Sequence, residues 1–151
     1  MPTIVVASDA PSVRAEIVSV LSSPRVTIVE ASSGPQALEL ASQLSPELVI
    51  VDLQMGNMGG MAVCLELRLR ESYLDVEPVA VLMLLDRRPD VFLARRSGAE
   101  GWLVKPLDPI RLRRATAALL DGGAYEDESY RPVPVLVGSG SPPPAGSLGA
   151  T

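Results

Sequence analysis

Short apolar runs alternate with longer stretches of helical periodicity along most of this chain, and few architectures accept such an order. The apolar runs have the length of β-strands and cover residues 3–8, 25–31, 47–53, 78–85 and 101–104. The first, third and fourth lack polar alternation, as expected for strands buried on both faces of a parallel sheet. Between the runs, apolar residues recur at helical spacing, as at Val13, Ile17 and Val20. This order predicts a doubly wound α/β sheet of five parallel strands with helices on both faces.

The composition changes after about residue 122. Up to that point, Pro11, Pro35, Pro89 and Pro109 stand where the first turns of helices are expected. Beyond it, Gly, Pro and Ser dominate, with one short apolar patch at residues 133–137. We therefore expect a single folded domain over residues 1–122 and a mostly disordered tail over residues 123–151.

Charge and composition exclude several classes of function. The net charge of -5 argues against a general binder of nucleic acid or of anionic membranes. The longest apolar stretch, residues 79–85, is too short to span a bilayer. With one cysteine, Cys64, and no recognisable secretory leader, we expect a cytoplasmic protein. The chain contains no histidine, so histidine catalysis, histidine metal ligands and a phosphohistidine on these residues are excluded.

Two acidic residues and one lysine stand where three of the strands are expected to end. Asp9 follows the first strand, Asp52 ends the third in the stretch LVIVDLQMGNMGG, and Lys105 follows the fifth. The carboxyl ends of the strands form the functional crevice of such a sheet, so the three side chains should converge. Two close carboxylates suit Mg2+, an ammonium stabilises a transferring phosphoryl group, and a carboxylate can become an aspartyl phosphate.

Each of these motifs alone has a simpler interpretation, because an Asp at a strand end often caps a turn and Lys-Pro is an ordinary strand exit. The combination favours a functional site. Among 13 basic residues Lys105 is the single lysine, and it stands where a compact ammonium on a flexible stem is needed.

The motifs ASDAPSVR, ELVIVDLQMGNMGG and SGAEGWLVKPLDP, together with the order of five strands and five helices, resemble the receiver domain of two-component response regulators over residues 3–120. The resemblance implies a flavodoxin-like sheet with the strand order 2-1-3-4-5. It also implies that Asp52 is the phosphoacceptor, that Asp9, Asp52 and the Gln54 carbonyl bind Mg2+, and that Lys105 pairs with the phosphoryl group. A cis Lys105–Pro106 bond is expected, since only X-Pro bonds adopt this form at low cost.

Several positions depart from the family pattern. Ser8 replaces the first of two acids after the first strand, which should weaken the metal site, although a simple turn role is favoured for it. An ungapped count back from Lys105 places Met83 where the family has Thr or Ser at the end of the fourth strand. A thioether cannot donate a hydrogen bond, and a core role is favoured for Met83. Trp102 stands at the switch aromatic, as a partner-facing anchor or a packing residue. Gly56 and Gly59 should loosen the loop after Asp52.

The sequence offers one surface for output. No segment for a DNA-binding or enzymatic domain is visible, so we expect a non-enzymatic switch that signals by binding another protein, and a homodimer stays open. The expected fourth helix, fifth strand and fifth helix carry an arginine-rich face with few acids. We name this the arginine face, and its basic residues are Arg87, Arg88, Arg95, Arg96, Lys105, Arg111, Arg113 and Arg114. A solvated helix surface is the simpler interpretation.

The tail begins with an acidic cluster, Glu126, Asp127 and Glu128, which suggests that it docks on the arginine face and competes with a partner. The leading hypothesis is a bacterial receiver that a sensor histidine kinase, a phosphotransfer protein or a small phosphodonor phosphorylates on Asp52. The rival is a pseudo-receiver that serves as a scaffold without phosphorylation, which Ser8 and Met83 allow. A nucleotide-binding domain is disfavoured, because the first strand-helix turn lacks a glycine-rich phosphate loop.

Overall fold

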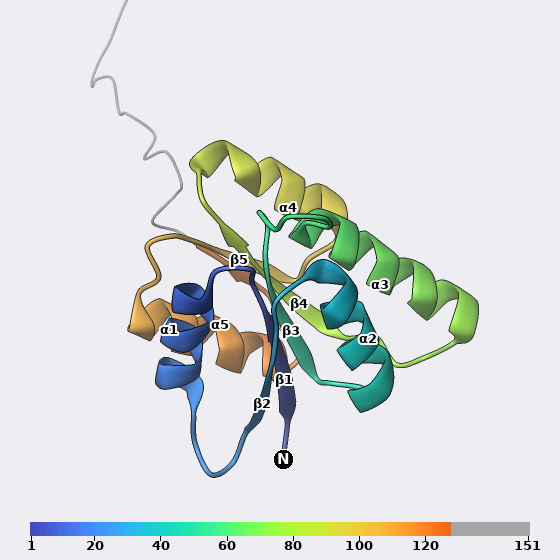
Figure 1. Ribbon diagram of the computed structural model, residues 1–151, viewed down its shortest axis with the longest axis horizontal. Coiled ribbons are helices and arrows are strands. Elements are labelled where there is room, and N and C mark those ends of the chain that lie inside the picture. The colour runs from blue at the N-terminus through green and yellow to red at the C-terminus, as the bar shows by residue number, and fades with distance from the viewer. Residues whose placement is uncertain (128–151) are drawn as a thin grey trace, which may run out of the picture.

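The computed structural model describes residues 1–127 and shows one sheet between two layers of helices (Figure 1). Helices α1 and α5 cover one face of the sheet, and α2, α3 and α4 cover the other. All neighbouring strands are parallel, in the order β2-β1-β3-β4-β5-β6. The elements in chain order are β1 (Thr3–Ala7), α1 (Pro11–Leu21), β2 (Thr27–Ala31), α2 (Gly34–Leu44), β3 (Leu48–Asp52), α3 (Gly60–Leu74), β4 (Ala80–Leu85), a 3-10 turn η1 (Arg88–Asp90), α4 (Val91–Ser97), β5 (Gly101–Val104), α5 (Pro109–Leu120) and β6 (Tyr125–Glu126).

The predicted class and the strand order 2-1-3-4-5 are confirmed, but the sheet has a sixth strand. This strand, β6, lies beyond residue 122, where the tail is predicted to begin. It is only two residues long and one of them is a glutamate, so it has no apolar run that could reveal it. The rest of the predicted tail, including the apolar patch at residues 133–137, lies outside the described residues.

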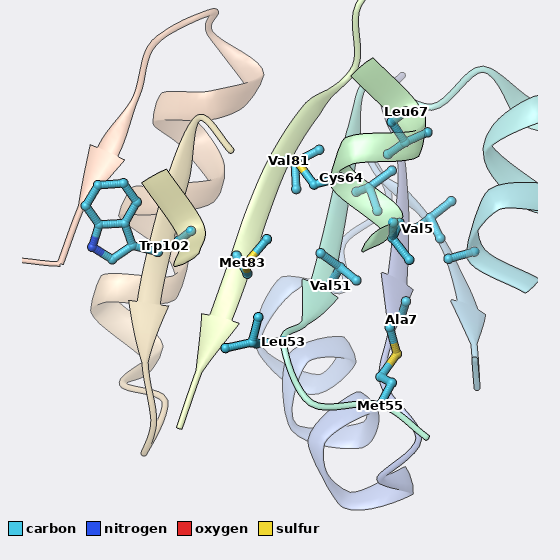
Figure 2. Close-up of a cluster of buried hydrophobic side chains, with 14 of the residues drawn as sticks. Val5, Ala7, Val51, Leu53, Met55, Cys64, Leu67, Val81, Met83 and Trp102 are labelled. Atoms are coloured by element: carbon cyan, nitrogen blue, oxygen red, sulfur yellow. The ribbon is translucent and has the colours of Figure 1, made fainter. Parts of the chain in front are cut away.

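Alternate residues of the strands form two separate cores. Val5, Val49 and Val81 face α2, α3 and α4, and this cluster is drawn in Figure 2. Their neighbours Ile4 and Ile50 face α1 and α5 on the other side. Strand β3 is buried along its whole length, which is why its sequence shows no polar alternation. Each doubly buried strand ends where its apolar run ends. The polar residues that follow these runs therefore lie together at the carboxyl ends of the strands.

Prolines and side-chain caps set where the helices begin. Pro11 and Pro109 are the first residues of α1 and α5, as predicted, since the missing N–H of proline is not needed there. Asp108 caps α5, accepting the N–H of Ile110 at 2.7 Å and that of Arg111 at 3.4 Å. The bond from Ile110 is the main reason why the pKa of Asp108 lies below its ordinary value. None of the helices within residues 1–127 has the length and apolar character that crossing a bilayer requires.

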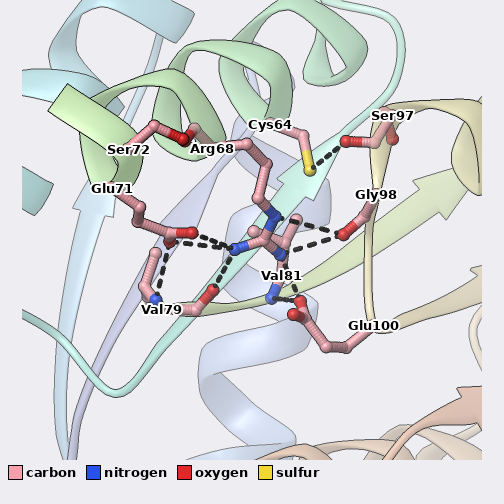
Figure 3. Close-up of polar contacts among 9 residues, drawn as sticks. All are labelled: Cys64, Arg68, Glu71, Ser72, Val79, Val81, Ser97, Gly98 and Glu100. Atoms are coloured by element: carbon pink, nitrogen blue, oxygen red, sulfur yellow. Dashed lines mark hydrogen bonds and ion pairs between the residues drawn. The ribbon is translucent and has the colours of Figure 1, made fainter. Parts of the chain in front are cut away.

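One arginine on α3 joins three separate segments of the chain (Figure 3). The Arg68 guanidinium donates to the Val79 carbonyl at 2.8 Å, just before β4, and to the Gly98 carbonyl at 3.0 Å, after α4. It also forms ion pairs with Glu71, at 2.9 Å, and with Glu100. Glu100 in turn accepts the N–H of Val81. Arg68 thus ties α3 to the entrance of β4 and to the turn that leads into β5.

Replacing Arg68 by methionine is expected to lower the free energy of unfolding by about 2 kcal/mol. Methionine keeps the apolar stem but removes the guanidinium shared by two carbonyls and two carboxylates, and the arginine side chain is only 23% exposed. Urea unfolding measures the change. Arg70→Met is the matched control, because Arg70 on the same helix is 36% exposed and forms an ordinary (i,i+4) pair with Glu66. Equal losses in the two variants would contradict a special role for Arg68.

Candidate functional site

The carboxyl ends of β1, β3 and β5 meet at one edge of the sheet, as predicted. Asp52 is the last residue of β3 and is only 2% exposed. Lys105 follows β5, and its Nζ lies 2.9 Å from each carboxylate oxygen of Asp52. The Lys105–Pro106 bond is cis, which confirms that expectation. A buried carboxylate is thus held by a single ammonium that contacts both of its oxygens.

The ammonium of Lys105 has a second anionic partner that the sequence analysis missed. Asp86 follows the end of β4, and its Oδ1 lies 3.1 Å from Nζ. Burial disfavours the charge on Lys105, but its hydrogen bonds to Asp52 and Asp86 outweigh burial, so the pKa of Lys105 lies above its ordinary value. The signal was available in the sequence, because Asp86 directly follows a buried run that ends at the same edge of the sheet as Asp52.

Ser8 contacts Asp52 directly and is therefore more than a turn residue. Its Oγ donates to Oδ2 of Asp52 at 2.9 Å, and the serine is fully buried. The same Oγ accepts the N–H of Ala10 at 3.1 Å, so the predicted turn role is also present. Arg14 donates to the Ser8 carbonyl at 2.6 Å and holds this turn from α1. Where the family pattern has an acid, this chain has a neutral hydroxyl that stabilises the charge on Asp52.

Asp9 and Gln54, the other two predicted cation ligands, lie in the loops after β1 and β3. Asp9 is exposed, and its Oδ2 accepts the N–H of Gly56 at 3.1 Å, which ties the end of β1 to the loop after β3. The Gln54 side chain is exposed. Within residues 1–127 no three Asp, Glu, His or Cys side chains gather into a metal cage. The available ligands are therefore all oxygens and few in number, which fits Mg2+ with several bound waters, because this ion dehydrates reluctantly.

Gly59 and Gly60 allow close backbone packing after Asp52, whereas a Cβ atom at Gly56 would find no atom nearer than 4.0 Å. A Cβ atom on Gly59 would lie 2.5 Å from the Leu53 carbonyl oxygen, and one on Gly60 would lie 2.7 Å from that of Asp52. The N–H of Gly60 donates to the Leu53 carbonyl at 3.0 Å. Strand β3 and the first turn of α3 therefore touch backbone to backbone, and a side chain at either glycine would push the loop away from Asp52. The expected looseness is not borne out at Gly59.

β4 ends at Leu85, as the predicted strand over residues 78–85 does, and not at Met83, where the ungapped count places the family's Thr or Ser. β4 continues two residues beyond Met83 to Leu85, whose carbonyl accepts the N–H of Lys105 at 2.8 Å. Met83 is fully buried and lies opposite Trp102 in the register of β4 and β5, so its predicted core role is confirmed (Figure 2). An ungapped count back from Lys105 therefore stops two residues short of the last residue of β4. Leu85 has no hydroxyl either, so this position still lacks a hydrogen-bond donor.

Strand β6 lies against the arginine face and binds two of its arginines. Glu126 lies 3.5 Å from Arg95, whose guanidinium stands 5.3 Å from the ring centroid of Trp102. Asp127 is 2% exposed, pairs with Arg111 at 2.9 Å and accepts the N–H of Val104 at 2.9 Å. Docking of the acidic segment is thus confirmed for these two acids, while Glu128 lies outside the described residues. Trp102 is 6% exposed, which supports its packing role and not that of a partner-facing anchor.

Comparison with known proteins gives a consistent family. The family model described as response regulator receiver domain matches residues 4–117. The nitrate/nitrite response regulator protein NarL of Escherichia coli K12 is 35% identical over 133 residues, 87% of this chain and 60% of that protein. Protein PilH of Pseudomonas aeruginosa is 25% identical over 81% of this chain and 100% of its own length. The solved signal receiver domain of NarL from Mycobacterium tuberculosis is 31% identical with a TM-score of 0.71, covering 80% of this chain and 97% of that one.

Proposed function

The chain belongs to the family of response regulator receiver domains, and from that premise we propose that it is a phosphorylation switch whose phosphoacceptor is Asp52. Domains of this family act in two-component signalling and are generally not enzymes. The observation that carries the proposal is the contact of Lys105 with both oxygens of a carboxylate that is 2% exposed. A buried carboxylate facing one ammonium is a nucleophile placed beside the charge that stabilises its product.

The reaction is a phosphoryl transfer from a sensor histidine kinase, a phosphotransfer protein or a small phosphodonor. An Asp52 oxygen forms a bond to phosphorus while the bond from phosphorus to the donor atom breaks. The electron pair of that bond leaves with the donor, and an imidazole donor then takes up a proton. Since the 151 residues contain no histidine, a phosphohistidine donor must lie outside them. Lys105 balances the charge on the transferred group, and Ser8 keeps the carboxylate oriented through its 2.9 Å hydrogen bond.

Asp9, Asp52 and the carbonyl of Gln54 would hold Mg2+ at this site, as the family pattern implies. The ion would supply positive charge against the phosphoryl oxygens. Because Ser8 replaces one acid, the protein offers one negative ligand fewer than the family pattern. We infer that a higher Mg2+ concentration is required for half-maximal phosphorylation than in a receiver with both acids.

We infer further that output passes through the arginine face to a separate protein. Arg87, Arg88, Arg96, Arg113 and Arg114 are exposed there, while β6 binds the side of the face formed by Arg95 and Arg111. A partner that binds Arg95 or Arg111 would compete with Glu126 and Asp127. The contacts around Trp102 are where a change at Asp52 would be transmitted, because β5 carries Trp102 and leads directly to Lys105.

A scaffold that binds partners without phosphorylation is the second candidate function. The observations that favour it are Ser8 in place of an acid and Leu85, not a Thr or Ser, at the end of β4. Both changes remove groups that the family pattern directs at the metal or the phosphoryl group. Neither removes Asp52 or Lys105, so the phosphorylation switch remains the stronger proposal.

Intact-mass measurement after incubation with acetyl phosphate and Mg2+ tests the two candidates. We expect one phosphoryl adduct on the wild-type chain, because its single buried carboxylate next to the ammonium is the best nucleophile at this edge. Asp52→Asn, which keeps the shape but not the nucleophile, should gain none. Asp9→Asn should need more Mg2+ for the same yield. An unmodified wild-type chain at saturating donor and Mg2+ would support the scaffold instead.

A further inference from the structure

The ammonium of Lys105 contacts three carboxylate oxygens before any phosphoryl group arrives. An ammonium has three N–H bonds. Its Nζ lies 2.9 Å from Oδ1 and 2.9 Å from Oδ2 of Asp52, and 3.1 Å from Oδ1 of Asp86. A phosphoryl oxygen that approaches Lys105 therefore competes with these three oxygens for the ammonium.

The contact with Asp86 is the one that phosphorylation does not weaken by itself. When an Asp52 oxygen becomes bonded to phosphorus, that oxygen loses its carboxylate charge and its attraction for the ammonium falls. Asp86 keeps its full charge and keeps attracting Lys105. Its carboxylate also repels the negative oxygens of the incoming group, because Asp86 and Asp52 contact the same Nζ atom.

The Asp86 side chain has no visible structural task that would explain its position. Within residues 1–127 its recorded contact is the ion pair with Lys105, and the side chain is 39% exposed. An ion pair this exposed contributes little to folding stability. Its two neighbours differ from it, since Leu85 is fully buried in the core and Arg87 pairs with Asp90. Asp86 is thus free to act on Lys105 without a role in holding β4.

We propose that Asp86 is a positioning residue that holds Lys105 in the resting state and restrains phosphoryl capture at Asp52. This inference rests on the proposed function of Asp52. The site has Ser8 in place of an acid near the predicted cation position, and it has a second acid, Asp86, beside Lys105. The chain is therefore set to respond to strong or abundant phosphodonors.

Asp86→Asn tests this role, because asparagine keeps the size of the side chain and removes its charge. We expect phosphorylation by acetyl phosphate with Mg2+, followed by intact mass, to become about five-fold faster, as expected for removing one like charge a few ångströms away in a partly solvated site. Beryllium trifluoride, an anion that mimics the phosphoryl group, should bind about five-fold more tightly by calorimetry. Asp86→Glu restores the carboxylate and should return both quantities toward wild type.

Glu39→Gln is the matched control, since it removes the same charge from an exposed position on α2 and should leave both quantities unchanged. A gain in function with rescue by glutamate is a result that a merely structural role of Asp86 would not give. Adduct formation in wild type and Asp86→Asn at the same rate, or more slowly in the variant, would overturn the role of Asp86 alone. No adduct and no beryllium trifluoride binding in any of these proteins would overturn the proposed function together with it.

Discussion

Lys105→Met should slow the phosphorylation of Asp52 by roughly 100-fold, the scale of removing one charged stabilising donor from a reaction site. The ammonium touches both oxygens of Asp52, so it stabilises negative charge wherever it develops on the transferred group. No other lysine exists in the chain, and Ser8 is the remaining side-chain donor to Asp52 within the described residues. A neutral hydroxyl provides hydrogen bonding but no positive charge, so it cannot replace Lys105.

The rate is measured by intact mass at several acetyl phosphate concentrations with saturating Mg2+. Lys105→Arg separates charge from geometry, because a planar guanidinium carries the charge but cannot approach both oxygens from one atom. We expect it to recover only part of the rate. Arg113→Met removes a positive charge from an exposed position on α5 and should change the rate less than two-fold. A Lys105→Met variant as fast as wild type would exclude Lys105 from the reaction.

Arg111→Met should release β6 from the edge of the sheet. Asp127 is almost completely buried, and Arg111 is its recorded ion-pair partner at 2.9 Å. Removing this ion pair takes a positive charge away from a buried carboxylate, so we expect the short segment to detach more readily and to expose Asp127 to water. Detachment limits the loss in global stability to about 1–2 kcal/mol, the range of a few lost hydrogen bonds and one ladder contact.

Amide hydrogen exchange measures the detachment of β6. The N–H of Val104 donates to Asp127, and that of Tyr125 donates to the Glu100 carbonyl at 3.1 Å. Both amides should exchange at least ten-fold faster in Arg111→Met, while amides of β3 remain protected. Arg114→Met, an exposed position on the same helix, is the control and should leave both amides unchanged. Unchanged protection at Tyr125 in Arg111→Met would show that the ion pair does not hold β6.

Gly101→Ala provides an independent route to the same state. A Cβ atom at Gly101 would lie 2.8 Å from the Tyr125 carbonyl oxygen, so alanine cannot coexist with β6 in its present place. If β6 shields the arginine face, Gly101→Ala, which keeps every arginine of that face, should bind a partner there more tightly than wild type. The gain should shrink at high salt, because contacts between exposed charges are screened.

The fold could be predicted where burial dominates the choice of residues. β1, β3 and β4 lie between two layers of helices, so their residues are apolar without alternation, and their positions were predicted to within one or two residues. β6 could not be predicted, because two residues carry no periodic pattern. The contacts that hold it include those of Asp127 with Arg111 and with the Val104 N–H, which join residues well separated in the chain.

At the site, too, some features follow from the sequence and others only from tertiary contacts. Asp52 and Lys105 were found from order alone, because parallel strands place their carboxyl ends at one edge of a sheet and any polar residue that ends a buried run must emerge there. The hydrogen bond from Ser8 and the second acid at Asp86 depend on the register between strands and on the direction of each side chain. A linear pattern records which residues must be buried and roughly where a strand stops, since burial is a property of single positions. Contacts between two side chains depend on which distant residues folding brings together. Only the tertiary structure therefore shows which side chains bind Asp52 and Lys105.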